Sequence, residues 1–192
     1  MATQGLPWIT PGQYLEIERK ADGKSEYIGG QMYAMSGVTL SHDRIVVNTL
    51  FNLLLHLRGG PCEVRSADFR VQIPAFGIYT YPDVSVMCGP PQCTDEVRDT
   101  FTNPCLIVEV LSDSTKNYDR GEKFRYYRSL PSFAEYLLLA QDEMRAERHV
   151  RQPDGTWVMR EFLVATDKIE LLSVGCAVIL GDLYELVVFP SA

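Results

Sequence analysis

Apolar residues recur along the chain with two spacings, and the segments with a spacing of three to four residues predict helices. Helices are expected over residues 9–21, 41–58 and 114–130. The first has Thr10 as its N-cap, and the third ends before Pro131. In the second, which Gly59 terminates, apolar residues cover nearly the whole circumference. We therefore expect this long helix to be largely buried.

Runs of β-forming residues between these helices predict strands. We expect a hairpin within 25–37, strands over 62–74, 78–88, 105–112 and 134–140, and a hairpin around 153–156. The segment 105–112 is a continuous apolar run, which is typical of a central strand that is buried on both faces. The closing segment 181–189 fits either a helix or a strand.

Length and composition favour one domain over 1–192 that mixes helices and strands. The 192 residues, 46% of them hydrophobic, suffice for one substantial core. No repeat, low-complexity tract or flexible linker divides the chain. We expect no signal peptide and no membrane segment, because no run has the required basic start or apolar length.

Charge and cysteine content bear on partners and location. The net charge of −7 argues against a protein that coats nucleic acid through bulk electrostatics, although local basic patches can coexist with it. The cysteines are odd in number and lack the CxxC spacing of a zinc site. They are Cys62, Cys88, Cys93, Cys105 and Cys176. We interpret them as reduced thiols in a cytoplasmic protein.

Glu109 is the unusual residue of the apolar run 105–112. An ionised carboxylate in a buried strand is costly unless a metal ion or another cation compensates its charge. A bound metal is one interpretation of Glu109. The other is a buried salt bridge, for which Lys123 is a candidate partner.

Asp83 follows Pro82 and begins another apolar run, on the strand expected beside that of Glu109. A single Pro-Asp pair is an ordinary strand entry and a weak signal. Together, the carboxylates of Asp83 and Glu109 and a backbone carbonyl, here that of Val110, form an oxygen ligand set that suits Mg²⁺ or Mn²⁺.

Lys123 lies on the helix that follows the Glu109 strand, and the short connection lets this helix pack back over the strand. Its ammonium could then orient a nucleophile or stabilise the transition state of phosphodiester hydrolysis. The alternative is a surface ion pair with Asp119, four residues earlier. The same helix carries further basic residues that could grip a phosphate backbone, namely Lys116, Arg120, Arg125 and Arg128.

Several segments are similar in order and content to a large bacterial family of restriction-endonuclease-like proteins, formerly catalogued as a domain of unknown function. They are EYIGGQMYAMSG, SHDRI, YPDVSV, PCLIVEVLS, DRGEKFRYY and PSFAEYLLLA. The resemblance implies the α/β fold of the PD-(D/E)xK nucleases, a central mixed β-sheet flanked by helices, here with extra hairpins at both ends. It matches Asp83 and Glu109 to the two acids of that motif. The motif lysine falls on Leu111, and the resemblance points to Lys123 as its replacement.

Two further residues are weaker candidates. Glu26, in the first hairpin, matches an acid that is common in the family and would complete the metal site. Its alternative is a hydrated hairpin residue. His42, at the start of the long helix, could contact a phosphate or polarise a water. Its alternative, a helix N-terminal hydrogen bond or a satisfied buried imidazole, is the favoured one. Tyr81 and Ser112 border the acids and are expected to shape the pocket.

The sequence thus predicts a metal-dependent endonuclease that hydrolyses DNA, with Mg²⁺ or Mn²⁺ as cofactor. Two alternatives stay open, a catalytically silent binding or assembly module with the same fold and a hydrolase of another phosphate ester. The apolar residues of the 41–58 helix and of the C-terminal VVF run also leave room for a homodimer interface.

Overall fold

The computed structural model describes residues 8–189 and centres on a mixed sheet of six strands in the order β11-β10-β9-β8-β6-β3. These strands are β3 (Cys62–Ser66), β6 (Val84–Cys88), β8 (Leu106–Leu111), β9 (Glu135–Ala140), β10 (Ala146–Arg151) and β11 (Trp157–Phe162). Within this sheet only the β8–β9 pair is parallel. Every residue of β8 and β9 is buried, which confirms the predicted central strand.

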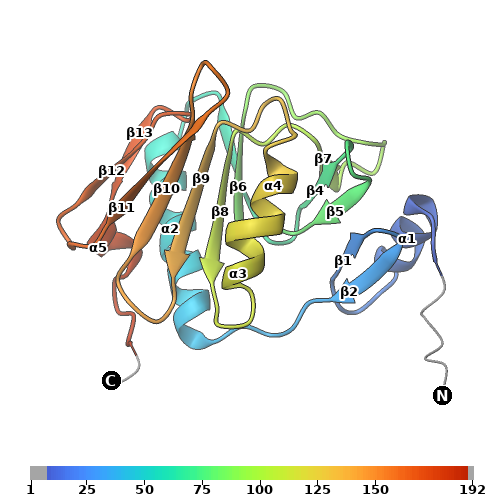
Figure 1. Ribbon diagram of the computed structural model, residues 1–192, viewed down its shortest axis with the longest axis horizontal. Coiled ribbons are helices and arrows are strands. Elements are labelled where there is room, and N and C mark those ends of the chain that lie inside the picture. The colour runs from blue at the N-terminus through green and yellow to red at the C-terminus, as the bar shows by residue number, and fades with distance from the viewer. Residues whose placement is uncertain (1–7, 190–192) are drawn as a thin grey trace.

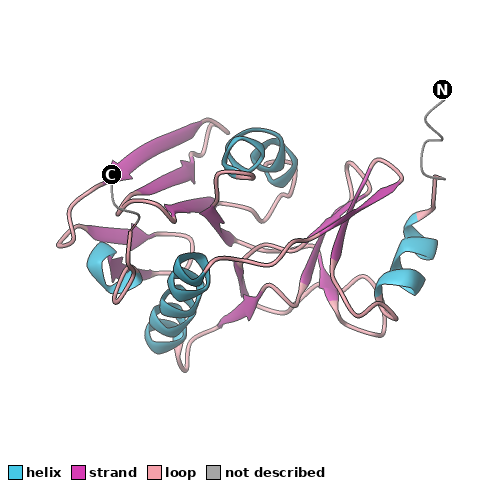
Figure 2. Ribbon diagram, turned by 90° about the horizontal axis from the view of Figure 1, so that it is seen from below, coloured by secondary structure: helices cyan, strands magenta, loops and turns pink. Residues whose placement is uncertain are grey.

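Helices cover both faces of this sheet (Figures 1 and 2). α2 (Leu40–Leu57) lies on one face and packs against Val84, Val108 and their neighbours. The other face is covered by α3 (Lys116–Tyr118), the π-helical turn η1 (Asp119–Lys123) and α4 (Phe124–Tyr127), with Ile107 and Leu111 beneath them. The odd-numbered residues of β8, Glu109 included, therefore point toward the η1 side.

A second sheet adjoins the central one, with strand order β2-β1-β5-β4-β7. It contains β1 (Ser25–Ile28), β2 (Gln31–Ala34), β4 (Arg70–Ile73), β5 (Ile78–Thr80) and β7 (Thr100–Phe101). Each of the strands predicted over 62–74 and 78–88 is broken in two, because its halves join different sheets. The second break falls at 81–83, where Pro82 supplies no amide for a ladder. Asp83 therefore lies at the junction of the two sheets.

The remaining elements agree with the sequence in most respects. α1 (Pro11–Glu18) begins with a capping box in which Thr10 and Gln13 bond reciprocally. The hairpin β1–β2 forms as predicted, and the hairpin β10–β11 extends the central sheet instead of standing apart from it. A last hairpin, β12 (Lys168–Leu171) and β13 (Cys176–Ile179), precedes the short helix α5 (Leu180–Leu183), so the closing segment begins as a helix. No helix within residues 8–189 is both long and apolar enough to cross a membrane.

One prediction about the helices was wrong. α2 is buried on one face only, and Phe51 remains 63% exposed on the other. The apolar period of a helix shows which residues are hydrophobic, but it does not show what covers them. The helix predicted over 114–130 forms over residues 116–127, with a π-helical turn at Asp119–Lys123 in its middle. Such turns are frequent at functional sites.

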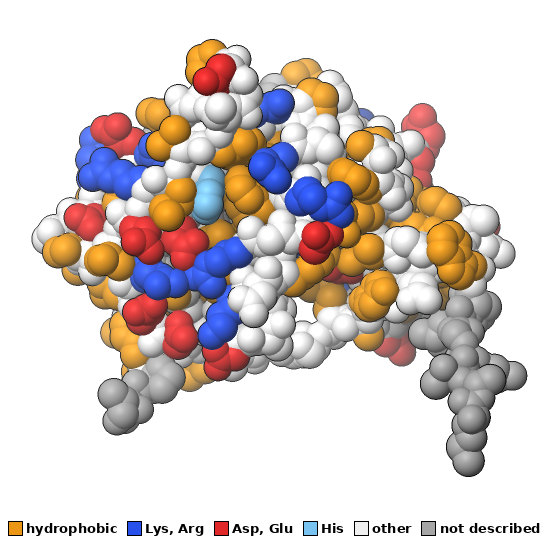
Figure 3. Space-filling view, viewed as in Figure 1, with side chains coloured by type: hydrophobic (Ala, Val, Ile, Leu, Met, Phe, Trp, Pro, Cys, Tyr) orange, Lys and Arg blue, Asp and Glu red, His pale blue; other side chains and the backbone are white. Residues whose placement is uncertain are grey.

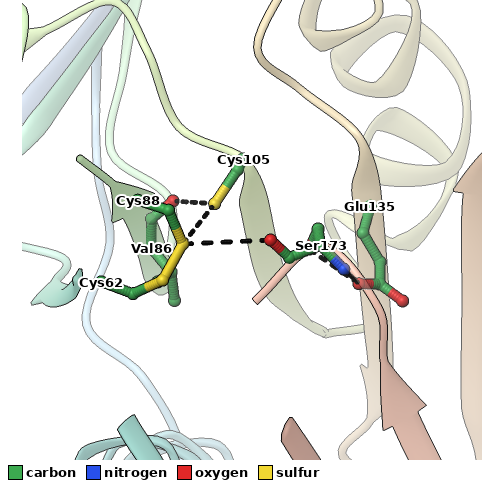
Figure 4. The surroundings of a disulfide bond; sticks show 6 residues. All are labelled: Cys62, Val86, Cys88, Cys105, Glu135 and Ser173. Carbon is green, nitrogen blue, oxygen red and sulfur yellow. Dashed lines mark hydrogen bonds between the residues drawn. A yellow bond between two sulfur atoms is a disulfide. The ribbon is translucent and has the colours of Figure 1, made fainter. Parts of the chain in front are cut away.

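The prediction that all five cysteines are reduced was also wrong. Cys62 and Cys88 are paired in register on β3 and β6 and form a disulfide. The Sγ atom of Cys105, on the other side of β6, lies 3.5 Å from Sγ of Cys88 (Figure 4). Disulfides are rare in the cytosol, so the cysteines no longer support a cytoplasmic location. That location stays a prediction.

Candidate active site

Asp83 and Glu109 lie on the same face of the central sheet. β6 and β8 are antiparallel with Val84 opposite Val108, so the next positions outward are Asp83 and Glu109. The Asp83 amide donates to Oε2 of Glu109 at 3.4 Å, and the Val110 amide donates to Oδ2 of Asp83 at 2.7 Å. The register of two strands therefore brings together the two acids that the sequence singled out.

Lys123 approaches these acids from the π turn. Its Nζ lies 2.9 Å from Oε1 of Glu109, 3.3 Å from Oε1 of Glu26 and 3.7 Å from Oδ1 of Asp119. The residue is only 5% exposed, which contradicts the alternative of a surface ion pair with Asp119. The other alternative, a buried salt bridge between Lys123 and Glu109, does form.

Leu111 occupies the position at which the PD-(D/E)xK motif has its lysine. It is 4% exposed and packs in the core beneath the helical layer, which is formed by α3, η1 and α4. The ammonium beside Glu109 comes from Lys123, on a different element. A lysine stem is long enough for such a relocation, because only the position of the charged head matters.

Glu26 and His42 belong to the same cluster. Glu26, on β1, is 8% exposed, so the alternative of a hydrated hairpin residue was wrong. Its Oε1 accepts a hydrogen bond from the Tyr81 amide at 3.3 Å. The imidazole Nε2 of His42 lies 3.1 Å from Oδ1 of Asp83, and the amide of His42 donates to the Thr39 cap of α2. The imidazole is thus satisfied by one of the candidate acids.

The charges of the site are unequal. Three carboxyl groups, those of Glu26, Glu109 and Asp119, surround the Lys123 ammonium, and a fourth, that of Asp83, lines the same pocket. Burial raises the pKa of Glu109 well above its usual value, while Lys123 acts in the opposite direction. Burial alone would lower the pKa of Lys123, but the carboxylates of Glu109 and Glu26 outweigh it and the pKa rises well above its usual value. The Glu109 shift reflects loss of hydration, whereas the Lys123 shift reflects the carboxylates gathered around its ammonium.

Tyr127 is a site residue that the sequence analysis missed. Its hydroxyl donates to Oε1 of Glu109 at 2.9 Å and lies 3.1 Å from Oγ1 of Thr80. A signal was available, because Tyr127 is four residues after Lys123 and positions at this spacing share one face of a helix. Tyr127 is completely buried, so it fixes the Glu109 side chain instead of meeting solvent.

A pocket of about 440 Å³ is lined by Glu26, His42, Asp83, Glu109 and Lys123. Its walls include the end of β2 with the loop before α2, residues 33–39, and the loop before α3, residues 112–115. Tyr81 and Ser112 line it, as the sequence predicted. The rim is more apolar than basic, with Tyr33 51% and Val38 59% exposed.

The basic side chains of the helical layer do not form a free phosphate-binding patch. Arg120 pairs with Glu147, Arg125 with Glu122, and Lys116 with Asp113. Arg128 lies over the ring of Phe124. Figure 3 shows basic and acidic side chains intermixed on this face of the molecule.

The carboxylate oxygens of the pocket are of the kind that divalent cations such as Mg²⁺ prefer. Across residues 8–189, no three Asp, Glu, His or Cys side chains are already arranged as a metal-binding group. Mg²⁺ seldom needs one, since it usually keeps several waters and is held by one or two carboxylates together with substrate phosphates. The facing acids Asp83 and Glu109, in a pocket short of positive charge, fit that pattern.

The chain is similar to several known proteins. A model of the Uma2 family, described as "Putative restriction endonuclease", matches residues 11–179. An uncharacterized protein of Synechocystis sp., slr1290, is 39% identical over 185 residues, which span 96% of this chain and 95% of that protein. A second Synechocystis protein, sll1609, is 35% identical over 162 residues, or 84% of this chain and 92% of that protein.

A solved structure shows the same fold. It is the crystal structure of "a putative nuclease belonging to DUF820" from Anabaena variabilis, with a TM-score of 0.75 and 15% identity. The match covers 94% of this chain and 99% of that one. The predicted nuclease-type α/β fold is therefore confirmed.

Proposed function

The chain belongs to the Uma2 family of restriction-endonuclease-like proteins, and from its site we propose that it is a divalent-metal-dependent nuclease that hydrolyses phosphodiester bonds of DNA. One observation carries the proposal. Asp83 and Glu109 occupy facing positions of neighbouring strands, and a buried lysine lies beside them. A purely structural strand has no need of two acids at this point.

Asp83 and Glu109 would hold Mg²⁺ or Mn²⁺, with the carbonyl of Val110 and the carboxylate of Glu26 as further oxygen ligands. The bound cation would lower the pKa of a water molecule and neutralise charge on the phosphate. The charge shortage of the pocket supports this assignment, because one ammonium cannot balance four carboxyl groups.

The residues around the acids would have distinct tasks. Lys123 supplies a fixed positive charge beside Glu109, suited to a phosphoryl oxygen or to the attacking water. Tyr127 holds the Glu109 carboxylate in place. His42 orients Asp83 through its imidazole. The acids thus have fixed positions before any substrate arrives.

A catalytically silent binding module is the alternative, and three observations favour it. The 2.9 Å contact between Lys123 and Glu109 satisfies the carboxylate without a metal. The net charge of −7 and the apolar rim also give nucleic acid little general attraction. The homodimer expected from the sequence is likewise a proposal and rests on the outer face of α2.

A nicking assay separates the two functions. Supercoiled plasmid and single-stranded DNA would be incubated with the wild type in Mg²⁺, in Mn²⁺ and in excess chelator. We expect metal-dependent cleavage that Glu109→Gln and Lys123→Ala each reduce by about 100-fold or more. Glu122→Gln, an exposed acid one residue before Lys123, is the matched control and should cleave normally.

The outcome decides between nuclease and module. Cleavage of equal rate in the wild type and both site variants would place the activity elsewhere. Absence of cleavage in either metal, together with absence of Mn²⁺ binding by calorimetry, would support the silent module. Binding of Mn²⁺ that Asp83→Asn abolishes, without cleavage of DNA, would point to another phosphate ester as substrate.

A further inference from the structure

The outer face of α2 is apolar. Residues facing the sheet, such as Ile45 and Leu53, are at most 1% exposed. The opposite side of the helix carries a stripe of apolar side chains between 52% and 75% exposed, namely Leu40, Val47, Phe51, Leu54 and Leu55. At 100° per residue, these positions are centred opposite the buried face. A helix that packs on a single sheet should present polar residues there.

The apolar surface continues onto the C-terminal segment. Leu186 and Val188 are 75% and 80% exposed. The segment is fixed beside α2 by hydrogen bonds from Ser41 to the Val188 carbonyl at 3.0 Å and from Asn48 to the Glu185 carbonyl at 2.9 Å. Scattered apolar residues are ordinary on a protein surface, but a continuous patch marks an interaction site. Figure 2 shows α2 at the margin of the molecule, with no element outside it.

We propose that this face binds the same face of a second copy of the chain, with the two α2 helices antiparallel. One stripe on one straight helix is self-complementary, which is what a two-fold interface requires. The midpoint of the pairing would lie between Leu50 and Phe51. Phe51 would then pack close to the two-fold axis, with Val47 against Leu54 of the partner subunit.

Charge selects the antiparallel arrangement. Asp43 and Arg58 are both exposed, and they lie equally far from the midpoint, near opposite ends of α2. Antiparallel pairing brings Asp43 toward Arg58 of the partner subunit twice. Parallel pairing would set Asp43 against Asp43 of the partner subunit and Arg58 against Arg58 of the partner subunit. Antiparallel helix dipoles are also the favourable combination.

This pairing would place the two candidate active sites at opposite ends of the interface. His42, in the first turn of α2, is eight to nine residues from the midpoint on the buried side of the helix. The two His42 positions would be about 25 Å apart along the shared axis, at 1.5 Å of rise per residue. The interface itself does not depend on the nuclease proposal, because it uses none of the site residues.

Light scattering coupled to gel filtration tests the surface. We expect the wild type to elute with the mass of a dimer at micromolar concentration. Phe51→Asp and Leu55→Asp, both at exposed positions, should raise the dissociation constant by about 100-fold or more and give monomers with unchanged circular dichroism. Val158→Asp, 55% exposed on β11, is the matched control and should remain dimeric. A monomeric wild type, or a dimer that survives Phe51→Asp, would overturn the proposal.

Charge reversal tests the direction of the helices. Asp43→Arg alone should weaken the dimer, because it sets arginine against Arg58 of the partner subunit at both ends. Combining it with Arg58→Asp should restore the wild-type dissociation constant. If the double variant is no tighter than the single one, the antiparallel arrangement is wrong.

Discussion

Replacing Lys123 by methionine removes the one ammonium of the site while keeping the length of the side chain. In the wild type its Nζ contacts Glu109 at 2.9 Å and Glu26 at 3.3 Å, and Glu109 is only 3% exposed. Removing one partner of a buried ion pair costs about 3 to 5 kcal/mol, because the other charge is left uncompensated. We expect Lys123→Met to lose unfolding free energy in that range at pH 8.

The loss should shrink in acid. Lys123 is the main group that opposes the effect of burial on Glu109, and burial already raises the pKa of Glu109 well above its usual value. A raised folded-state pKa gives stability that is complete below the unfolded pKa of about 4.3 and is lost as pH rises through the folded value. Lys123→Met should therefore lie closer to the wild type at pH 5 than at pH 8.

Urea unfolding followed by fluorescence measures both effects. Adding Glu109→Gln to Lys123→Met should recover most of the lost stability, since the uncompensated acid is gone. Lys116→Met, at a lysine of the same helical layer whose side chain is 41% exposed, should leave stability unchanged. A loss below about 1 kcal/mol at pH 8, or the same loss at pH 5 and pH 8, would refute the view that Lys123 neutralises a buried carboxylate.

Three further predictions concern the scaffold. Reducing the Cys62–Cys88 disulfide, which spans 26 residues, should lower the unfolding free energy by about 3 to 4 kcal/mol, and urea titrations with and without reductant would disprove this if they coincide. Burial and a hydrogen bond to Glu18 raise the pKa of Tyr81 to about 12, so the protein should lose stability between pH 10 and 12, and less so in Tyr81→Phe. Arg19 and Arg70 hold the pKa of Asp99 below its usual value, so Asp99→Asn should destabilise at pH 7 more than at pH 3; equal effects at both pH values would contradict the pairing.

The sequence predicted the local structure well where local rules decide it. Thr10 caps α1 because its side chain bonds within the first turn, and that signal needs no other part of the chain. The run 105–112 forms a central strand because an apolar segment of this length must be covered on both faces. Glu109 was unusual in that run because an ionised carboxylate is costly in a strand that is buried on both faces.

Other features depended on segments that meet only in the folded chain. Tyr127 was missed because its contact with Glu109 depends on how the helical layer packs on the sheet. The Cys62–Cys88 bond depends on the register of β3 and β6, which cysteine spacing does not reveal. The exposure of Phe51 was predicted wrongly, because the apolar period of a helix gives the positions of its apolar side chains but does not show which of them another segment covers.

The sequence by itself determined the residue types of the site, two acids in apolar runs and a lysine on the following helix. Only the tertiary structure decided that Glu26, His42 and Asp83 meet there, at the junction of two sheets. The physical reason is that helix caps and apolar periods act over a few neighbouring residues. Contacts between distant segments follow instead from strand order and register, which the whole core fixes at once.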